Sequence, residues 1–129
     1  MNDVSDQEFD ALISRAMDEL PQEYIRGLDN VVVTYADEPT EHQQRRRGVH
    51  DHGLLLGLYE GVPLTARGAG YTFVLPDKIT LFKHALMQIS HDEADFFEHI
   101  KRTLWHEIAH FYGLDHDRID YLEQRGRLH

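Results

Sequence analysis

Hydrophobic residues recur at helical spacing in two parts of the chain, one near each end. The first follows a capping-box sequence, Ser5 with Glu8, and its apolar positions are Phe9, Leu12, Ile13, Ala16 and Leu20. Because Pro21 cannot continue a helix, we expect this helix to end at about residue 20. A second capping box, Ser90 with Glu93, predicts the start of a long helix that continues to about residue 112.

Between these helices the pattern changes to short apolar runs of the kind that form strands. Residues 31–35, 54–59 and 79–82 are rich in aliphatic side chains and are bounded by turn-forming residues. Residues 37–52 are polar and predict a loop, and residues 60–77 are rich in Gly and Pro. Residues 85–89 predict a short helical turn, and residues 117–125 a short terminal helix.

The long helix should have two chemically different faces. At about 100° per residue its apolar side chains fall within a sector of about 80°; they are Phe97, Ile100, Leu104, Ile108 and Phe111. His99, His106 and His110 fall roughly opposite, within about 40° of one another. One face should therefore pack on the core while the other lines a cleft. Trp105 and Tyr112 are expected in the core.

The histidine face carries a metal-binding motif. Residues 106–110 read His-Glu-Ile-Ala-His, followed by Gly113 and His116, which gives H-E-x-x-H-x-x-G-x-x-H. Two histidines four residues apart on a helix reach one ion, and zinc accepts each nitrogen at about 2.0–2.1 Å. Glu107 lies beside the first histidine, where its carboxylate can act as a general base toward a zinc-activated water. Gly113 can take a positive φ and end the helix, so that the chain returns His116 as the third nitrogen.

Other donors compete with these assignments. Asp115 and Asp117 flank His116, and either carboxylate is an alternative third ligand or an acceptor that orients a ligand histidine. We expect His116 to be the ligand. The chain has no cysteine, and a site of three histidines leaves a position open for water, as catalytic zinc sites do. His50 and His52 form a second possible metal pair, although two histidines in a polar loop are usually solvated.

Composition narrows the function classes. At 129 residues, with 41% hydrophobic residues, the chain should form one domain spanning 1–129. A formal charge of −10 argues against a nucleic-acid partner, which would require clustered basic residues. The N-terminus lacks the features of a secretory signal, and no apolar run approaches the length of a membrane span. We therefore expect a cytoplasmic protein with no membrane partner.

The motif resembles that of the small bacterial zincin-like metallopeptidases, a family of minimal proteins with a compact, metzincin-like fold. The resemblance is specific over residues 106–117 and only topological before residue 90. It implies an α+β fold: a small, twisted, mixed sheet of three to four strands, an N-terminal helix, a long active-site helix and a short C-terminal helix. It also implies a zinc-dependent metallopeptidase that hydrolyses peptide bonds, with Zn²⁺ held by His106, His110 and His116.

The resemblance extends to the partner. The expected substrate is a peptide or an unfolded protein segment, bound by addition to an edge strand, for which residues 79–82 are the candidate. In this family the third ligand is often Asp, whereas His116 occupies that position here.

Two departures from the metzincin pattern keep other functions open. A metzincin has a Met-turn after its third ligand, but Met1, Met17 and Met87 all precede the motif. Few residues follow His116, so the usual wall of a substrate cleft is nearly absent. One alternative is a zinc-binding interaction module with little or no turnover. The other is a zinc hydrolase that acts on a non-peptide amide or ester.

Overall fold

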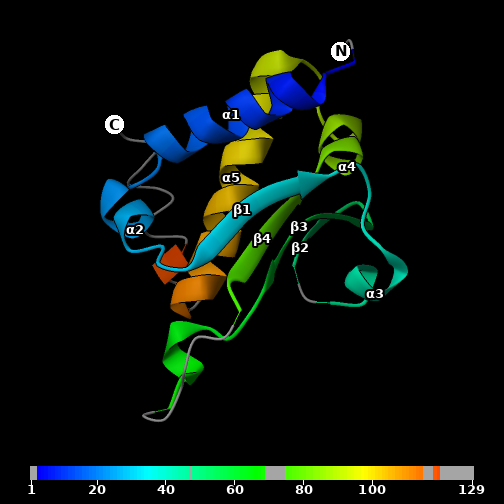
Figure 1. The fold of residues 1–129 in the computed structure, drawn as a ribbon. Helices are drawn as coiled ribbons and strands as arrows, with labels where there is room; N and C mark the ends of the chain where they lie inside the picture. The colour runs from blue at the N-terminus through cyan, green and yellow to red at the C-terminus, as the bar shows by residue number, and fades with distance from the viewer. Residues whose placement is uncertain (1–2, 47, 69–74, 115–117, 120–129) are drawn as a thin grey trace.

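A mixed sheet and a long helix dominate the structure, which is a computed structural model describing residues 3–46, 48–68, 75–114 and 118–119 (Figure 1). The elements in chain order are α1 (Asp6–Glu19), α2 (Gln22–Arg26), β1 (Val31–Ala36), α3 (Glu41–Gln44), β2 (Val49–Asp51), β3 (Leu54–Glu60), η1 (Leu64–Ala66), β4 (Asp77–Phe82), α4 (Lys83–Gln88) and α5 (Glu93–Tyr112). This arrangement confirms the predicted α+β class, the N-terminal helix and the long helix. The predicted terminal helix lies mostly outside the described residues.

The four strands have the order β1-β4-β3-β2. β1 runs parallel to β4, whereas β3 is antiparallel to both of its neighbours, so the sheet is mixed as predicted. The expectation that residues 79–82 form a free edge is wrong. They belong to β4, whose two sides are hydrogen-bonded to β1 and β3, and the edges of the sheet are β1 and β2.

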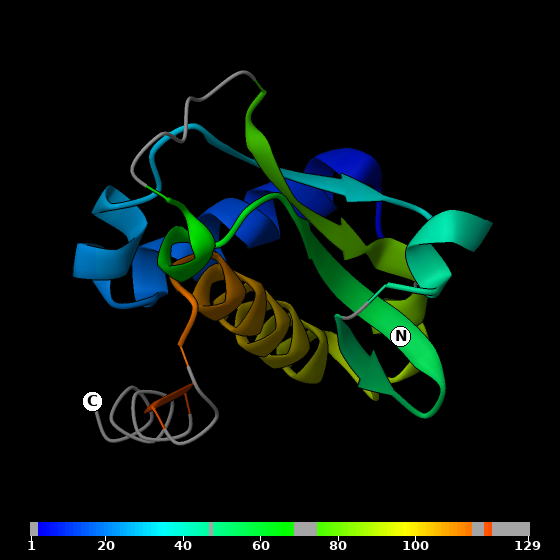
Figure 2. The ribbon, with the colours of Figure 1, turned by 90° about the horizontal axis from the view of Figure 1, so that it is seen from below.

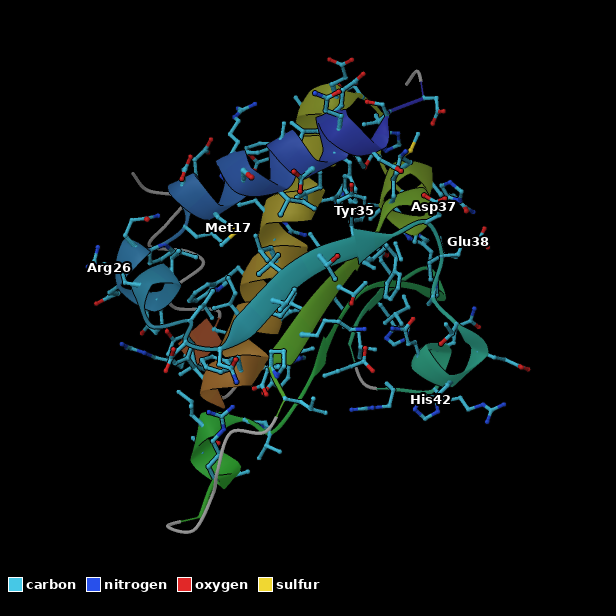
Figure 3. All side chains as sticks on the ribbon, in the orientation of Figure 1. Met17, Arg26, Tyr35, Asp37, Glu38 and His42 are labelled. Atoms are coloured by element: carbon cyan, nitrogen blue, oxygen red, sulfur yellow. The ribbon has the colours of Figure 1, made fainter. Side chains whose placement is uncertain are left out.

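The core lies between one face of the sheet and two helices, α1 and α5. Figure 2 shows α5 running along the sheet. Phe9 of α1 packs edge-on against Tyr35, with ring centroids 5.4 Å apart, and Tyr35 projects from β1 toward α1 in Figure 3. β3 approaches α5 closely at Gly57, where a Cβ would lie 2.6 Å from Cγ2 of Thr103. The missing side chain at Gly57 therefore lets the sheet sit directly on the helix.

Residues 37–52 are not the simple loop that their polarity predicts. They contain α3, whose N-terminus has a capping box formed by Thr40 and Gln43, and the short edge strand β2. The strand forms because His52 and Gly53 both have positive φ and reverse the chain into β3. β2 forms because it pairs with β3, and the composition of residues 37–52 alone does not predict this pairing.

The start of α5 also differs from the prediction. The N-cap is Asp92, whose carboxylate accepts a hydrogen bond of 2.8 Å from the backbone N–H of Asp95. Ser90 serves the preceding helix instead, since its hydroxyl donates to the carbonyl of Leu86 at 2.6 Å. The predicted capping box of Ser90 and Glu93 is therefore wrong by two residues. The pattern cannot separate the two candidate oxygens, because the choice depends on where α4 ends.

No helix in the described ranges is long and apolar enough to cross a membrane.

Replacing Asp92 by Ala should lower the free energy of unfolding by about 1 kcal/mol, because the N–H of Asp95 loses its acceptor. Asp92→Asn keeps a side-chain oxygen at that position and should stay close to wild type. Urea unfolding followed by circular dichroism measures both. If Asp92→Ala were as stable as Asp92→Asn, the N-cap would lie elsewhere.

Candidate metal centre

The predicted ligand helix forms, and its apolar face lies where the sequence indicates. The expected cleft along the histidine face stays a prediction. The apolar face is buried: Phe97, Ile100, Leu104, Ile108 and Phe111 are all in the core. Trp105 is buried in the core as predicted. Tyr112 is partly buried and packs against the core without being part of it. His99, His106 and His110 are half-buried. The helix thus fixes the two motif histidines one turn apart at the boundary of the core.

Glu107 lies between these histidines along the chain, and its side chain is completely buried. One carboxylate oxygen accepts a 3.0 Å hydrogen bond from the backbone N–H of Val49 in β2. The other oxygen lies 3.1 Å from Nδ1 of His110. Glu107 therefore connects the edge strand to the helix, which the sequence did not predict because the contact spans 58 residues.

The carboxylate of Glu107 also sets the chemistry of His110. As an acceptor it places the ring proton on Nδ1, which leaves Nε2 as the nitrogen with a free lone pair. The hydrogen bond from the ring to Glu107, together with the negative charge of Glu107, raises the pKa of His110, although partial burial of the ring acts in the opposite direction. A histidine held in this way by a carboxylate is the usual arrangement of a metal ligand.

Gly113 ends α5 as predicted. Its φ of 72° is left-handed, and the turn is closed by a 3.0 Å hydrogen bond from the N–H of Leu114 to the carbonyl of Ala109. The three candidates for the third ligand, His116, Asp115 and Asp117, lie outside the described residues. Farther along, Ile119 is buried.

The other histidines singled out in the sequence have separate partners. His99 lies with Nε2 3.3 Å from a carboxylate oxygen of Asp95, one turn earlier on α5. His50 approaches the carbonyl of Gly48 at 3.0 Å, and His52 contacts Asp51 at 2.6 Å. His50 lines a hollow of about 320 Å³ beside the β2–β3 turn, whereas His52 does not. The pair His50 and His52 is thus not gathered toward one point.

The donor set fits zinc as far as the structure describes it. His106 and His110 are on one helix, and the contact of His110 Nδ1 with Glu107 leaves Nε2 as the ring nitrogen that could bind a metal. Within the described ranges no three His, Asp or Glu side chains gather closely enough to hold a metal ion. A complete three-ligand site therefore needs a donor from outside those ranges, and the stretch 115–117 offers both imidazole and carboxylate.

Comparison with known proteins identifies the family of the chain. Residues 28–126 match the sequence family described as zincin-like metallopeptidase, and the chain belongs to this family. That range includes the sheet and the whole of α5. No curated protein matches the chain.

Among solved structures, a conserved hypothetical protein from T. thermophilus has a similar fold. It superposes with a TM-score of 0.52 and is 24% identical, over 94% of this chain and 99% of that one. The likeness supports the compact zincin-like fold predicted from the sequence.

Gly113→Ala should destabilise the protein by more than the roughly 1–2 kcal/mol typical of a left-handed Ala. A Cβ there would lie 2.7 Å from Cγ2 of Thr65 and closer still to its hydroxyl. Gly53→Ala is the matched control, because Gly53 has a φ of 78° but no atom within 4 Å of the added carbon. Chemical unfolding of both variants separates the cost of a left-handed Ala from the cost of the clash with Thr65. Equal losses would show that Thr65 moves aside freely.

Proposed function

We propose that this protein is a zinc-dependent metallopeptidase, with His106, His110 and His116 as ligands and Glu107 as general base. Membership of the zincin-like family supports zinc binding and hydrolysis in general terms. The observation that carries the proposal is the state of Glu107. This carboxylate is wholly buried, and its ionisable partner within the described part of the chain is His110, with no lysine or arginine beside it.

A buried carboxylate without a compensating cation is costly. The neutral N–H of Val49 and the ring of His110 offset part of that cost. A divalent cation held by the adjacent histidines would offset the remainder. The complete burial of Glu107 next to His110 therefore supports a metal site at this position.

Zinc, when bound, supplies a Lewis acid that polarises a substrate carbonyl and makes water acidic enough to react near neutral pH. The protein's own contribution is to place a proton acceptor and an oriented ligand. Glu107 would take the proton of the attacking water and deliver it to the leaving amine. Glu107 would also hold His110 through Nδ1, so that the lone pair of Nε2 is available for the metal.

The substrate would be an extended peptide beside β2, the last strand in the order of the described sheet. This strand replaces residues 79–82 as the candidate, since β4 is interior and β2 is at the edge of the sheet. Support comes from the hydrogen bond between Val49 and Glu107, because a peptide beside β2 would pass next to the proposed base. β2 is only three residues long, so we expect weak sequence preference.

A zinc-binding module without turnover is the second candidate, and a specific observation favours it. Both oxygens of Glu107 are occupied by partners within the protein, one by Val49 and one by His110. If the contact with His110 persists when metal is bound, Glu107 orients a ligand and does not act as a base. Turnover by the purified protein distinguishes the two candidates.

Purified protein should bind one zinc ion, and His106→Ala or His110→Ala should abolish most of the affinity. His116→Ala should weaken binding much more than Asp115→Ala or Asp117→Ala, because loss of an orienting carboxylate typically costs only about 10–100-fold. Metal analysis with chelator competition measures each dissociation constant. Undiminished zinc binding by a His106→Ala/His110→Ala double variant would overturn the site, and a large loss on Asp115→Ala or Asp117→Ala would make that carboxylate the third ligand.

Glu107→Gln should retain zinc and lose about 10²–10⁴ in the rate of peptide hydrolysis, because the amide cannot accept the proton. The variant keeps an oxygen acceptor for the N–H of Val49, which limits structural damage. A fluorogenic peptide library with the zinc-loaded proteins gives the comparison. Zinc-loaded wild type that cleaves none of the peptides would favour the second candidate, and equal rates in the two proteins would exclude Glu107 as the base.

A further inference from the structure

The C-terminal end of α5 is held by residues 61–67, a segment to which the sequence assigned no role. Its short helix η1 lies against this end of α5 (Figure 2). Thr65 fills the space beside Gly113, where an added Cβ would collide with its hydroxyl and methyl groups. The turn that ends α5 is therefore shaped by contact with Thr65 as well as by the φ of Gly113.

Arg67 anchors this segment to the sheet. Its Nε donates to the carbonyl of Val62 at 2.8 Å, and its Nη2 donates to the carboxylate of Asp77 at 2.6 Å. Its guanidinium carbon lies 5.5 Å from the ring centroid of Phe111, which is the residue after His110. The side chains of Arg67 and Asp77 are only 9% and 3% exposed, so solvent screens this ion pair weakly.

The side chain of Asp77 has two further neighbours, the hydroxyl of Tyr59 and the backbone at Gly61. The hydroxyl of Tyr59 donates to it at 2.5 Å, and burial together with this carboxylate raises the pKa of Tyr59, which keeps the hydroxyl protonated. The Tyr59 ring packs edge-on against Phe111, at 6.1 Å between centroids. A Cβ at Gly61 would run into the Asp77 side chain, so Gly61 permits the end of β3 to close over it.

These contacts converge on the part of α5 from which the chain continues to the third-ligand candidates. We propose that residues 61–67, anchored by the ion pair of Arg67 with Asp77, position the metal site by fixing the turn at Gly113. Thr65 and Arg67 are positioning residues, acting through Gly113 and Phe111 on the direction in which the chain leaves the helix. This inference rests on the proposed function.

Arg67→Lys and Thr65→Ala test the proposal. Lysine keeps the charge, but one ammonium cannot hold the Val62 carbonyl and the Asp77 carboxylate while stacking on Phe111. Arg67→Lys should weaken zinc binding by about 10–100-fold, the range typical of residues that orient ligands. Thr65 is exposed, so Thr65→Ala should fold normally, with an unchanged unfolding midpoint without metal, and still bind zinc several-fold more weakly.

Lys83→Met is the matched control. Lys83 is 8% exposed and pairs with Asp6 at 3.2 Å, between the starts of α4 and α1 and away from Gly113. It should bind zinc as wild type does. A second readout is the visible absorption of the cobalt-substituted proteins, which reports coordination geometry: the spectrum should change in Arg67→Lys and Thr65→Ala and not in Lys83→Met.

The proposal is overturned if wild type binds zinc and both site variants keep its affinity and cobalt spectrum, or if Lys83→Met weakens zinc as much as they do. Should Arg67→Lys fail to fold, Thr65→Ala decides alone. Wild type that binds no zinc would instead overturn the proposed function, and the present inference with it.

Discussion

The burial of α5 under the sheet is the constraint on which the rest of the structure depends. The apolar stripe of α5 from Phe97 to Phe111 is buried in the core, and the burial of these side chains holds the helix against the sheet. Gly57 lets β3 rest against Thr103 without an intervening side chain. The position of His106 and His110 therefore depends on the packing of the apolar face of α5. Their spacing along the chain is set by the helix itself.

Glu107 joins this helix to the edge of the sheet. It is the fully buried carboxylate on a helix whose neighbouring positions, Ile108 and Ala109, are apolar. Because the N–H that it accepts belongs to Val49, the position of β2 and the orientation of the carboxylate depend on each other. Any peptide that pairs with β2 would thus lie beside the same carboxylate that holds His110. Strand β2, Glu107 and His110, which are the proposed substrate edge, base and ligand, are thus linked by hydrogen bonds.

The sequence predicts those features of this unit that are local. The spacing of His106 and His110, the apolar stripe of α5 and the left-handed turn at Gly113 all follow from periodicity and from the chemistry of single residues, and each is confirmed. The ligand roles themselves stay predictions. The features that sequence reasoning missed depend on contacts distant along the chain. β2 exists because β3 pairs with it, and residues 79–82 are interior because β1, far earlier in the chain, pairs with them.

Two buried carboxylates show how differently this fold treats negative charge. Asp77 has a cation built in, the guanidinium of Arg67, and a phenol that stays protonated, so its charge is compensated by the chain itself. Glu107 is more deeply buried and has only a backbone N–H and a histidine as partners in the described part of the chain. Among the described residues, Glu107 thus lacks the arginine partner that Asp77 has in Arg67. Glu107 instead contacts His110, whose pKa it raises, and the metal ion of the proposed function would add positive charge at the same place.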